Sequence, residues 1–351
     1  MSDDLKFLIQ NSKQAYLHSC PKLLTWEITT ACNKRCSFCY HSDNYLDTCK
    51  HVSNDTIKDC LSFLDVSGIE GLALTGGEPI LHPKFNQILE VSCKHVPNVT
   101  VFSNGIAIDR TLCELFVSKG VMVNYSFDYH DSKNFSILQR LISLLPPSLL
   151  TVSLVYSGEN VSDFIDCLQN IRIHFSGDVY VNYAQFKGHA KYSSEALYNM
   201  VSLSKQLILL NMKSGIRIKG QYISDPIVNY FRKSAFTTFN CSICNNLKLD
   251  INGNVFPCPF FTDSSFTLGS IMSGINSQSF SSVIQTRSKH LKSLLYDRIA
   301  NSKCERCKWV SFCGGGCLLS IENDTHTAIN PISCSINKSI YEYINSIWNL
   351  Y

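Results

Sequence analysis

The sequence predicts an α/β fold in which an open, partial (β/α)6 barrel of the TIM type precedes a small cysteine-rich domain. Two observations predict the barrel. Short apolar runs alternate with segments of helical periodicity over the first two-thirds of the 351 residues, and 45% of all residues are hydrophobic, enough for a sizeable core. A third observation predicts the second domain, because eight of the 17 cysteines lie between residues 241 and 334.

Six segments rich in Val, Ile, Leu, Thr and aromatic residues are short enough to be buried parallel strands. They cover residues 23–30, 71–75, 98–103, 121–127, 149–156 and 179–185. Helical periodicity follows at 57–64, with Ser53 or Asn54 as the expected N-cap, and at 85–92, 112–116, 164–171 and 196–210. Six units are too few to close an eight-fold barrel, and the functional loops are expected after the carboxyl ends of the strands.

The chain is expected to divide into four parts. Residues 1–22 would be an N-terminal extension, 23–210 the partial barrel, 211–240 a linker and 241–351 the cysteine-rich domain. In this last part we predict a hairpin at 247–256 around an Asn-Gly turn and a closing helix at 340–351, with little other helical periodicity. Metal is expected to supply much of its core.

The charge pattern and the apolar pattern exclude several classes of protein. The formal net charge is only +3 and the charges are dispersed, so we expect no nucleic-acid partner. The N-terminus has no signal-peptide pattern and no apolar run is long enough for a bilayer, so we expect a cytoplasmic protein that does not enter the membrane. Because the cysteines cluster at metal-ligand spacings in a long chain, metal binding is favoured over a disulfide scaffold.

Three cysteines follow the first predicted strand at a spacing typical of an iron–sulfur site. Cys32, Cys36 and Cys39 could bind one face of a [4Fe–4S] cubane and leave its fourth iron open to a small molecule. The alternative is a structural zinc loop that lacks a fourth ligand. With Tyr40 beside the last cysteine and the strand before the first, this pattern resembles the radical S-adenosylmethionine (SAM) superfamily.

Segments after later strands resemble the SAM-binding motifs of the same superfamily. The second strand is followed by a Gly-Gly-Glu-Pro segment, the third ends in Ser-Asn-Gly, and the fourth ends in Ser-Phe-Asp. The segment after the sixth strand departs from the family pattern, because His stands where an Arg is usual. The resemblance implies cofactor-binding roles for Gly76, Gly77, Glu78, Pro79, Ser103, Asn104, Ser126 and His189.

The resemblance also implies the chemistry. A reduced cluster would cleave SAM to methionine and a 5′-deoxyadenosyl radical, which removes hydrogen from an unactivated carbon. An external electron donor of the flavodoxin or ferredoxin type is expected as a partner. Four residues near the barrel mouth are candidate bases, although each could equally be a solvated loop residue: Asp128, Tyr129, His130 and Asp131.

The C-terminal cysteine spacing resembles the SPASM extension of peptide-modifying radical SAM enzymes, which carries two auxiliary [4Fe–4S] clusters. With the first cluster, the resemblance implies three in all. Auxiliary cluster I would be bound by Cys241, Cys244, Cys258 and Cys317. Auxiliary cluster II would be bound by Cys304, Cys307, Cys313 and Cys334. Two zinc sites are the alternative, because four-cysteine zinc modules use similar spacings.

The two resemblances together imply oxidative modification of a ribosomally synthesised precursor peptide. The products of such enzymes include thioether and C–C cross-links, among them cyclophanes, and formylglycine. In the sulfatase-maturing branch an Asp follows the auxiliary-I cysteine, but Pro259 follows Cys258 here and aromatic residues surround it. Cross-linking is therefore expected, with four alternatives: a formylglycine maturase, a small-molecule SPASM oxidoreductase, an electron-transfer protein without SAM chemistry, or a zinc-stabilised binding module.

Overall fold

A single ten-stranded sheet organises the part of the chain that the computed structural model describes. The described residues are 21–184, 193–214, 218–220, 222–232, 244–261, 264–272, 277–300, 302–313, 315 and 331–348. The strand order is β10-β9-β8-β1-β2-β3-β4-β5-β6-β7. The strands are β1 (Leu23–Thr29), β2 (Gly71–Gly76), β3 (Asn98–Ser103), β4 (Met122–Phe127), β5 (Leu150–Tyr156), β6 (Asp178–Tyr183), β7 (Ile218–Lys219), β8 (Asn246–Leu249), β9 (Asn254–Phe256) and β10 (Gly269–Ser270).

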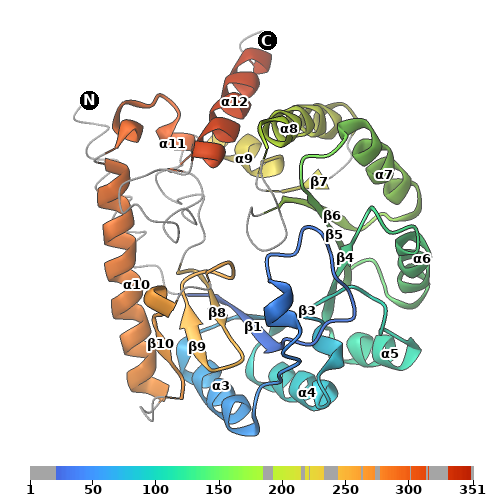
Figure 1. The fold of residues 1–351 in the computed structure, drawn as a ribbon, viewed down its shortest axis with the longest axis vertical. Coiled ribbons are helices and arrows are strands. Elements are labelled where there is room, and N and C mark those ends of the chain that lie inside the picture. The colour runs from blue at the N-terminus through green and yellow to red at the C-terminus, as the bar shows by residue number, and fades with distance from the viewer. Residues whose placement is uncertain are drawn as a thin grey trace.

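The strands from β1 to β7 are all parallel, and helices connect them along the outside of the sheet. Figure 1 shows these helices as an arc around the strands, and the strands do not close into a ring. The fold class predicted from the sequence, α/β with a partial barrel, is confirmed. The helices of the arc are α3 (Asn54–Ser67), α4 (Phe85–His95), α5 (Arg110–Lys119), α6 (Asn134–Leu144), α7 (Val161–His174) and α8 (Ser194–Ser214).

The six predicted strands are all present, with ends shifted by no more than two residues. The helix caps follow the expected local chemistry, because the Ser53 side chain accepts a hydrogen bond from the Thr56 amide at the start of α3. The sheet is wider than predicted. The segment expected to be a linker contains the end of α8, the strand β7 and the helix α9 (Ser224–Arg232). The boundaries between the domains stay a prediction.

The predicted hairpin is present and extends the barrel sheet. Strands β8 and β9 pair antiparallel around Gly253, whose φ of 80° favours glycine. Strand β8 also pairs in parallel with β1, with Leu23 opposite Asn246 and Trp26 opposite Leu249. The strand β1 therefore has neighbours on both sides, and Trp26 and Ile28 are fully buried. The cysteine-rich region thus joins the barrel through the strand that precedes the first cysteine motif.

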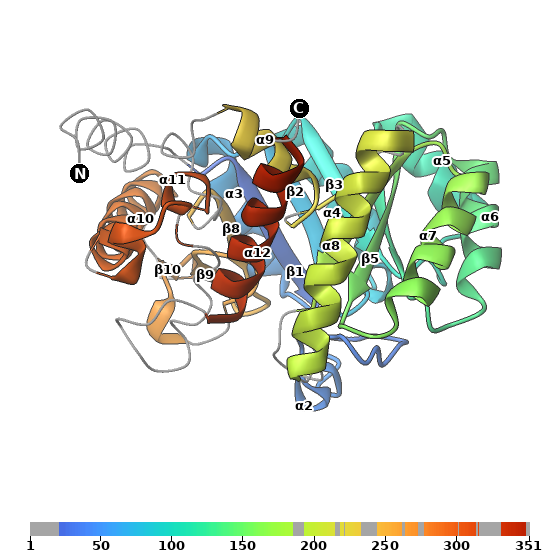
Figure 2. The same cartoon turned by 90° about the horizontal axis from the view of Figure 1, so that it is seen from above.

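The expectation of little helix in the cysteine-rich region is wrong. Helix α10 (Ser277–Ala300) lies there and packs against α3, with the Phe63 and Phe280 rings 5.5 Å apart. Figure 2 shows α10 at the side of the molecule opposite α6 and α7. The closing helix α12 (Pro331–Trp348) is present but begins earlier than predicted. The remaining short helices are α2 (Asp43–Leu46), η1 (Pro79–Leu81), η3 (Ser264–Phe266), η4 (Lys303–Arg306) and α11 (Val310–Cys313).

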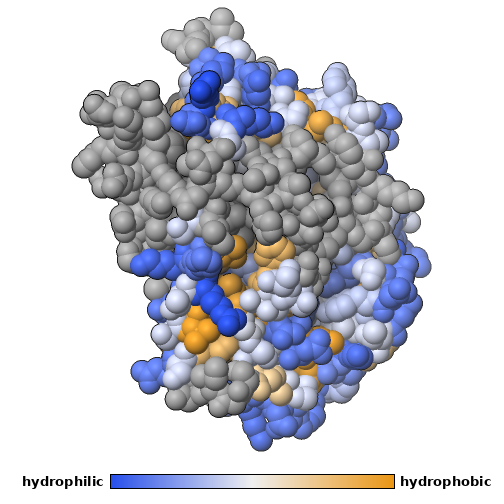
Figure 3. Space-filling view, turned by 60° about the vertical axis from the view of Figure 1, so that its left-hand side comes forward, coloured by the Kyte–Doolittle hydropathy of each residue, from blue (hydrophilic) through white to orange (hydrophobic). Residues whose placement is uncertain are grey.

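One face of the molecule is mostly hydrophilic where the structure describes it. Figure 3 shows charged and polar residues over most of the described area of one face, with a limited hydrophobic area in its lower part. Among the described residues, no helix combines the length and the apolar character that crossing a bilayer requires.

Candidate functional site

The three cysteines of the first motif lie on a loop directly after β1, which we call the cysteine loop (residues 32–41). Their side chains are half-buried. The Cys39 amide donates to the Cys36 carbonyl oxygen at 3.1 Å, and this turn brings the backbone of these two cysteines close together. Burial raises the pKa of all three thiols, that of Cys36 to about 12, and the charges of Cys32 and Cys39 add to that rise. A bound cation would reverse this effect, since it stabilises thiolates.

The chemistry of these three thiols fits a cubane. In the described part of the chain, no three His, Cys, Asp or Glu side chains are arranged to hold one metal ion. A [4Fe–4S] cubane separates its protein ligands, because each cysteine binds a different iron. The Lys34 amide lies 3.5 Å from Cys32 Sγ, as a donor to a metal-bound sulfur would. The donor set on the cysteine loop therefore fits an iron–sulfur cluster.

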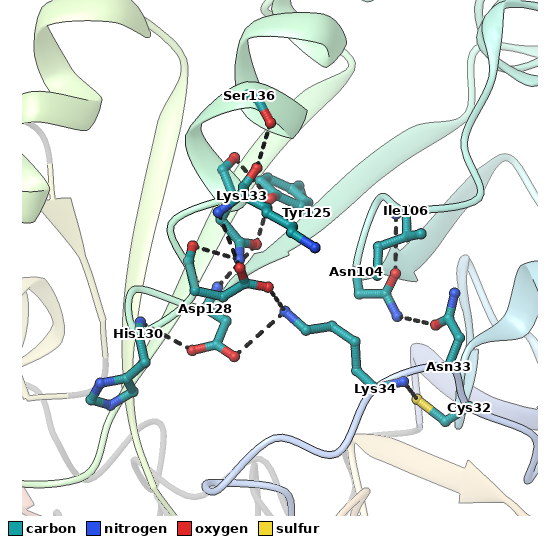
Figure 4. Close-up of polar contacts among 12 residues, drawn as sticks. Cys32, Asn33, Lys34, Asn104, Ile106, Tyr125, Asp128, His130, Lys133 and Ser136 are labelled. Carbon is teal, nitrogen blue, oxygen red and sulfur yellow. Dashed lines mark hydrogen bonds and ion pairs between the residues drawn. The ribbon is translucent and has the colours of Figure 1, made fainter.

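Polar contacts hold the cysteine loop against two other strand ends (Figure 4). The side-chain amide of Asn104, after β3, donates to Asn33 Oδ1 at 2.7 Å. The Lys34 ammonium reaches the β4 end, where it lies 3.0 Å from Asp131 Oδ2 and 3.5 Å from Asp128 Oδ2. Both Lys34 and Asp128 have side chains only 13% exposed, so water screens this ion pair little.

The Gly-Gly-Glu-Pro segment lies where β1 and β2 end side by side. A side chain at Gly76 would overlap the Thr29 backbone and one at Gly77 would overlap the Ala31 backbone, so both positions require glycine. The Glu78 amide donates to the Ala31 carbonyl oxygen at 2.7 Å. The two glycines therefore fix the distance between the second strand end and the cysteine loop.

Glu78 connects the second and third strand ends. Glu78 is 1% exposed, and its carboxylate accepts hydrogen bonds from Ser103 Oγ and from the backbone amide of Asn104, each at 2.8 Å. Burial raises the pKa of Glu78 to about 7. Pro79 begins η1 directly afterwards, and Ser126 lies on β4 beside Ser153 of β5. The structure thus brings Glu78, Ser103 and Asn104 together, whereas the predicted residue His189 lies outside the described residues.

The candidate bases at the end of β4 fall into two groups. Asp128 and Asp131 face Lys34, and a backbone amide together with Lys34 holds the pKa of Asp131 below its usual value. His130 points away from Lys34 in Figure 4, and its Nε2 lies 3.4 Å from Glu159 Oε1. Glu159 was not predicted from the sequence.

Tyr129 differs from its neighbours because its ring packs into the protein. The ring meets Phe164 edge-to-face at 4.9 Å, and burial raises the pKa of its hydroxyl. Beside the pair of His130 and Glu159 lies a polar cavity between the starts of α7 and α8, lined in part by Asn160, Glu195 and Asn199. Among the four candidate bases, His130 is therefore the one that combines an accessible nitrogen base with a carboxylate partner, Glu159.

A buried network at Glu27 was not predicted. Glu27, in the middle of β1, is 1% exposed; its Oε2 accepts from Tyr45 Oη at 3.0 Å and its Oε1 lies 3.4 Å from His41 Nε2. The Lys248 ammonium of β8, itself buried, lies 3.7 Å from Glu27 Oε1 and 4.7 Å from the centre of the Phe256 ring. The signal in the sequence that could have indicated this network was a single glutamate within an apolar strand. The network links the cysteine loop to the cysteine-rich region.

The structure brings together four C-terminal cysteines from three elements. Cys304 lies on η4, Cys307 directly after it, Cys313 ends α11 and Cys334 lies on α12. Burial raises the pKa of Cys304 and raises that of Cys313 to about 12, and the charges of the neighbouring cysteines contribute to both shifts. All four are free thiols. This set therefore fits the donor set of a second cluster.

The other C-terminal set is partly described. The Cys244 amide donates to the Pro257 carbonyl oxygen at 2.6 Å, which places Cys244 next to the chain segment of Cys258. Cys244 is fully buried with a φ of 61°, an uncommon conformation for a residue with a side chain. Cys241 and Cys317, the other two predicted members, lie outside the described residues.

The barrel is similar to a known protein family. The model of the Radical SAM superfamily matches residues 26–184. Among curated proteins, the antilisterial bacteriocin subtilosin biosynthesis protein AlbA of Bacillus subtilis is 24% identical over 93% of this chain and 74% of its own length. A cysteine-type anaerobic sulfatase-maturating enzyme of Clostridium perfringens is 22% identical over 92% of this chain and 95% of its own length.

Solved structures agree in fold. The protein anSMEcpe with bound AdoMet and Cp18Cys peptide superposes with a TM-score of 0.72 at 18% identity, over 95% of this chain and 99% of that one. SuiB of Streptococcus suis bound to its precursor peptide SuiA gives a TM-score of 0.66 at 16% identity, over 94% of this chain and 80% of that one. At these identities the likeness concerns the fold, and it extends beyond the barrel into the cysteine-rich region.

Proposed function

Because residues 26–184 match the model of the Radical SAM superfamily, we propose that the whole chain is a SAM-dependent oxidoreductase that cross-links a ribosomally synthesised peptide. The bond formed would be a C–C or a thioether bond. The observation that carries the oxidative part of this proposal is the assembly of Cys304, Cys307, Cys313 and Cys334 into one group of free thiols outside the barrel. A cluster there would be one of the auxiliary centres through which electrons from the substrate could leave.

The residues divide into those that would hold the cofactors and those that position them. Cys32, Cys36 and Cys39 would bind the first cluster, and Glu78 with its neighbours Ser103 and Asn104 would line the SAM site. When bound, SAM and the cluster supply a 5′-deoxyadenosyl radical that removes one hydrogen atom from the substrate. The chain contributes orientation, because the cysteine loop is tied to the ends of β3 and β4.

A cross-link also requires the loss of one proton and one further electron from the substrate. We assign the proton to His130, whose neighbour Glu159 would stabilise the imidazolium. Asp131 is a poorer candidate, because a backbone amide and the pairing with Lys34 hold its pKa below the usual value and so lower its affinity for a proton. Asp128 is already engaged in an ion pair with Lys34. We assign the electron to an auxiliary cluster at the C-terminal cysteines.

The peptide substrate is supported by the names of the similar proteins. AlbA is named for bacteriocin biosynthesis, and both structures chosen above contain a bound peptide. An external donor of the flavodoxin or ferredoxin type would reduce the first cluster.

A formylglycine maturase is the second candidate. The similarity to a sulfatase-maturating enzyme over most of both chains favours it. Pro259 argues against it, because proline follows Cys258 where the sulfatase-maturing branch has an acid. Proline has no titratable side chain and could not serve as a base at that position.

The test begins with protein purified without oxygen. We expect about twelve irons per chain, as three cubanes require, and formation of 5′-deoxyadenosine with dithionite and SAM. Co-expression with a short peptide encoded beside the gene should then yield a peptide lighter by two hydrogens. A reconstituted protein that forms no 5′-deoxyadenosine would overturn the proposal. A peptide in which a cysteine or serine becomes formylglycine would select the second candidate.

A further inference from the structure

A fully buried lysine lies beside one of the C-terminal cysteines. Lys292, on α10, is 0% exposed, and its Nζ donates to Asn245 Oδ1 at 3.0 Å. Asn245 directly follows Cys244 in the sequence, and the Lys292 charge acts on the Cys244 thiol. Lysine is almost never fully buried unless a charged or polar group offsets the loss of its hydration. A buried amino group therefore lies directly beside the chain segment that carries Cys244.

A second polar side chain of the same helix faces the same cysteine. Ser288 precedes Lys292 by one helical turn and so lies on the same side of α10. It is 3% exposed, and within the described part of the chain its hydroxyl makes no hydrogen bond of normal geometry. Burial raises the pKa of Cys244 to about 11, and Lys292 and Ser288 both oppose that rise. Both side chains thus act to stabilise negative charge at this sulfur.

We propose that Lys292, assisted by Ser288, raises the reduction potential of the auxiliary cluster that Cys244 and Cys258 would bind, and so makes that cluster the acceptor of the substrate's electron. This inference rests on the proposed function, because it requires a cluster at these cysteines. A [4Fe–4S] cluster with four thiolate ligands is an anion, and one-electron reduction makes it more negative. A buried cation stabilises the reduced form more than the oxidised form, because Coulomb energy grows with charge and is little screened in the interior.

The electron balance of the reaction explains why such tuning is needed. Hydrogen abstraction leaves a substrate radical; once the new bond has closed, the intermediate must lose one electron to the cluster and one proton to a base. A cluster that is easily reduced accepts this electron readily. The first cluster has the opposite task, since it must deliver an electron to SAM and needs a low potential. Lys292 would therefore separate the potentials of two clusters of the same composition.

The experiment measures potentials in a background that lacks the first cluster. Cys32, Cys36 and Cys39 are replaced by alanine, so that the auxiliary clusters alone contribute EPR signals during anaerobic potentiometry. In this background Lys292→Met removes the charge and keeps the length of the side chain. We expect the reduction equilibrium constant of one signal to fall by about tenfold, equivalent to about 59 mV for one electron.

Two controls separate tuning from a structural role. Lys289→Met removes a charge from an exposed position of the same helix and should move neither signal. The signal of the cluster at Cys304, Cys307, Cys313 and Cys334 is an internal reference and should also stay in place. Lys292→Arg keeps the charge and should restore most of the potential. Ser288→Ala should lower the potential by a smaller amount, since it removes one donor and no charge.

The experiment distinguishes a failure of the proposed function from a failure of the inference about Lys292. A background protein that binds no iron contradicts the auxiliary clusters of the proposed function, whatever Lys292 does. A protein that binds both clusters but shows an unchanged potential in Lys292→Met overturns the present inference alone. Should Lys292→Met lose its cluster, Lys292→Gln is measured instead, because it keeps a donor for Asn245 without the charge. An unchanged potential in that variant likewise overturns the inference.

Discussion

The cysteine loop and the C-terminal cysteine region hold their thiols in opposite ways. Cys32, Cys36 and Cys39 follow one another on a single loop, and that loop is bound to neighbouring strand ends through Asn33 and Lys34. The four cysteines between residues 304 and 334 come from η4, α11 and α12, which are separate elements. The first site therefore depends on a framework that exists without metal, whereas the second depends on elements that must be brought together.

This difference indicates in which region metal binding and folding are coupled. The barrel has an apolar core through every strand from β1 to β6, so it is expected to fold whether or not the cysteine loop is loaded. The elements η4 and α11 are single turns that cannot be stable alone. Metal bound at their cysteines would contribute directly to the folding of that region.

Removal of the cysteines should separate activity from stability. The triple variant Cys32→Ala, Cys36→Ala, Cys39→Ala should lose all 5′-deoxyadenosine formation and about four irons while it keeps its melting temperature. The matched variant Cys304→Ala, Cys307→Ala should also lose about four irons but should melt at a clearly lower temperature. Iron analysis and differential scanning calorimetry give both readouts. Equal melting temperatures in the two variants would contradict the contrast.

Removal of metal by a chelator should affect the two regions unequally. Hydrogen exchange should become much faster in η4 and α11 and stay slow in β2, β3 and β4, because local opening requires only the loss of the weakest cooperative unit. Mass spectrometry of peptides after exchange measures this directly. Uniform protection in both regions after chelation would show that metal does not support the C-terminal fold.

The buried network between the two regions should carry a large share of stability. Glu27→Gln leaves the Lys248 ammonium without its buried countercharge, and we expect a loss of about 3–5 kcal/mol in the free energy of unfolding. Glu70→Gln is the matched control, because its ion pair with Lys22 is more than half exposed on both sides and should contribute less than about 1 kcal/mol. Anaerobic denaturant unfolding compares them, and similar losses would refute a special role for the network.

The tie between the cysteine loop and β4 should have the smallest effect. Lys34→Met removes a charged hydrogen bond to Asp131 and should lower the free energy of unfolding by about 1–2 kcal/mol. A double-mutant cycle with Asp131→Asn isolates the pair. Additive losses in that cycle would mean that the two side chains do not interact in solution.

Local patterns predicted the parts of the fold that local forces determine. Short segments of the sequence define the six strands and the cysteine spacings, so both could be predicted without coordinates. Helix α10 could not, because its buried face includes Ser281, Ser288 and Lys292, which mask an apolar period. The pairs of Glu27 with Lys248 and of Lys34 with Asp128 join residues far apart in sequence. Such contacts depend on how distant strands and loops pack together, and the periodicity of a short segment does not encode that packing.

The pairing of β1 with β8 has a consequence for synthesis of the chain. Strand β1 leaves the ribosome early, but the strand that covers its free edge begins only at Asn246. Until then one edge of an otherwise apolar strand is open to other chains, as edge strands of incomplete sheets are. The same interval leaves the cysteine loop accessible from that side. Delivery of the first cluster to the nascent chain would therefore be easiest before the C-terminal hairpin docks.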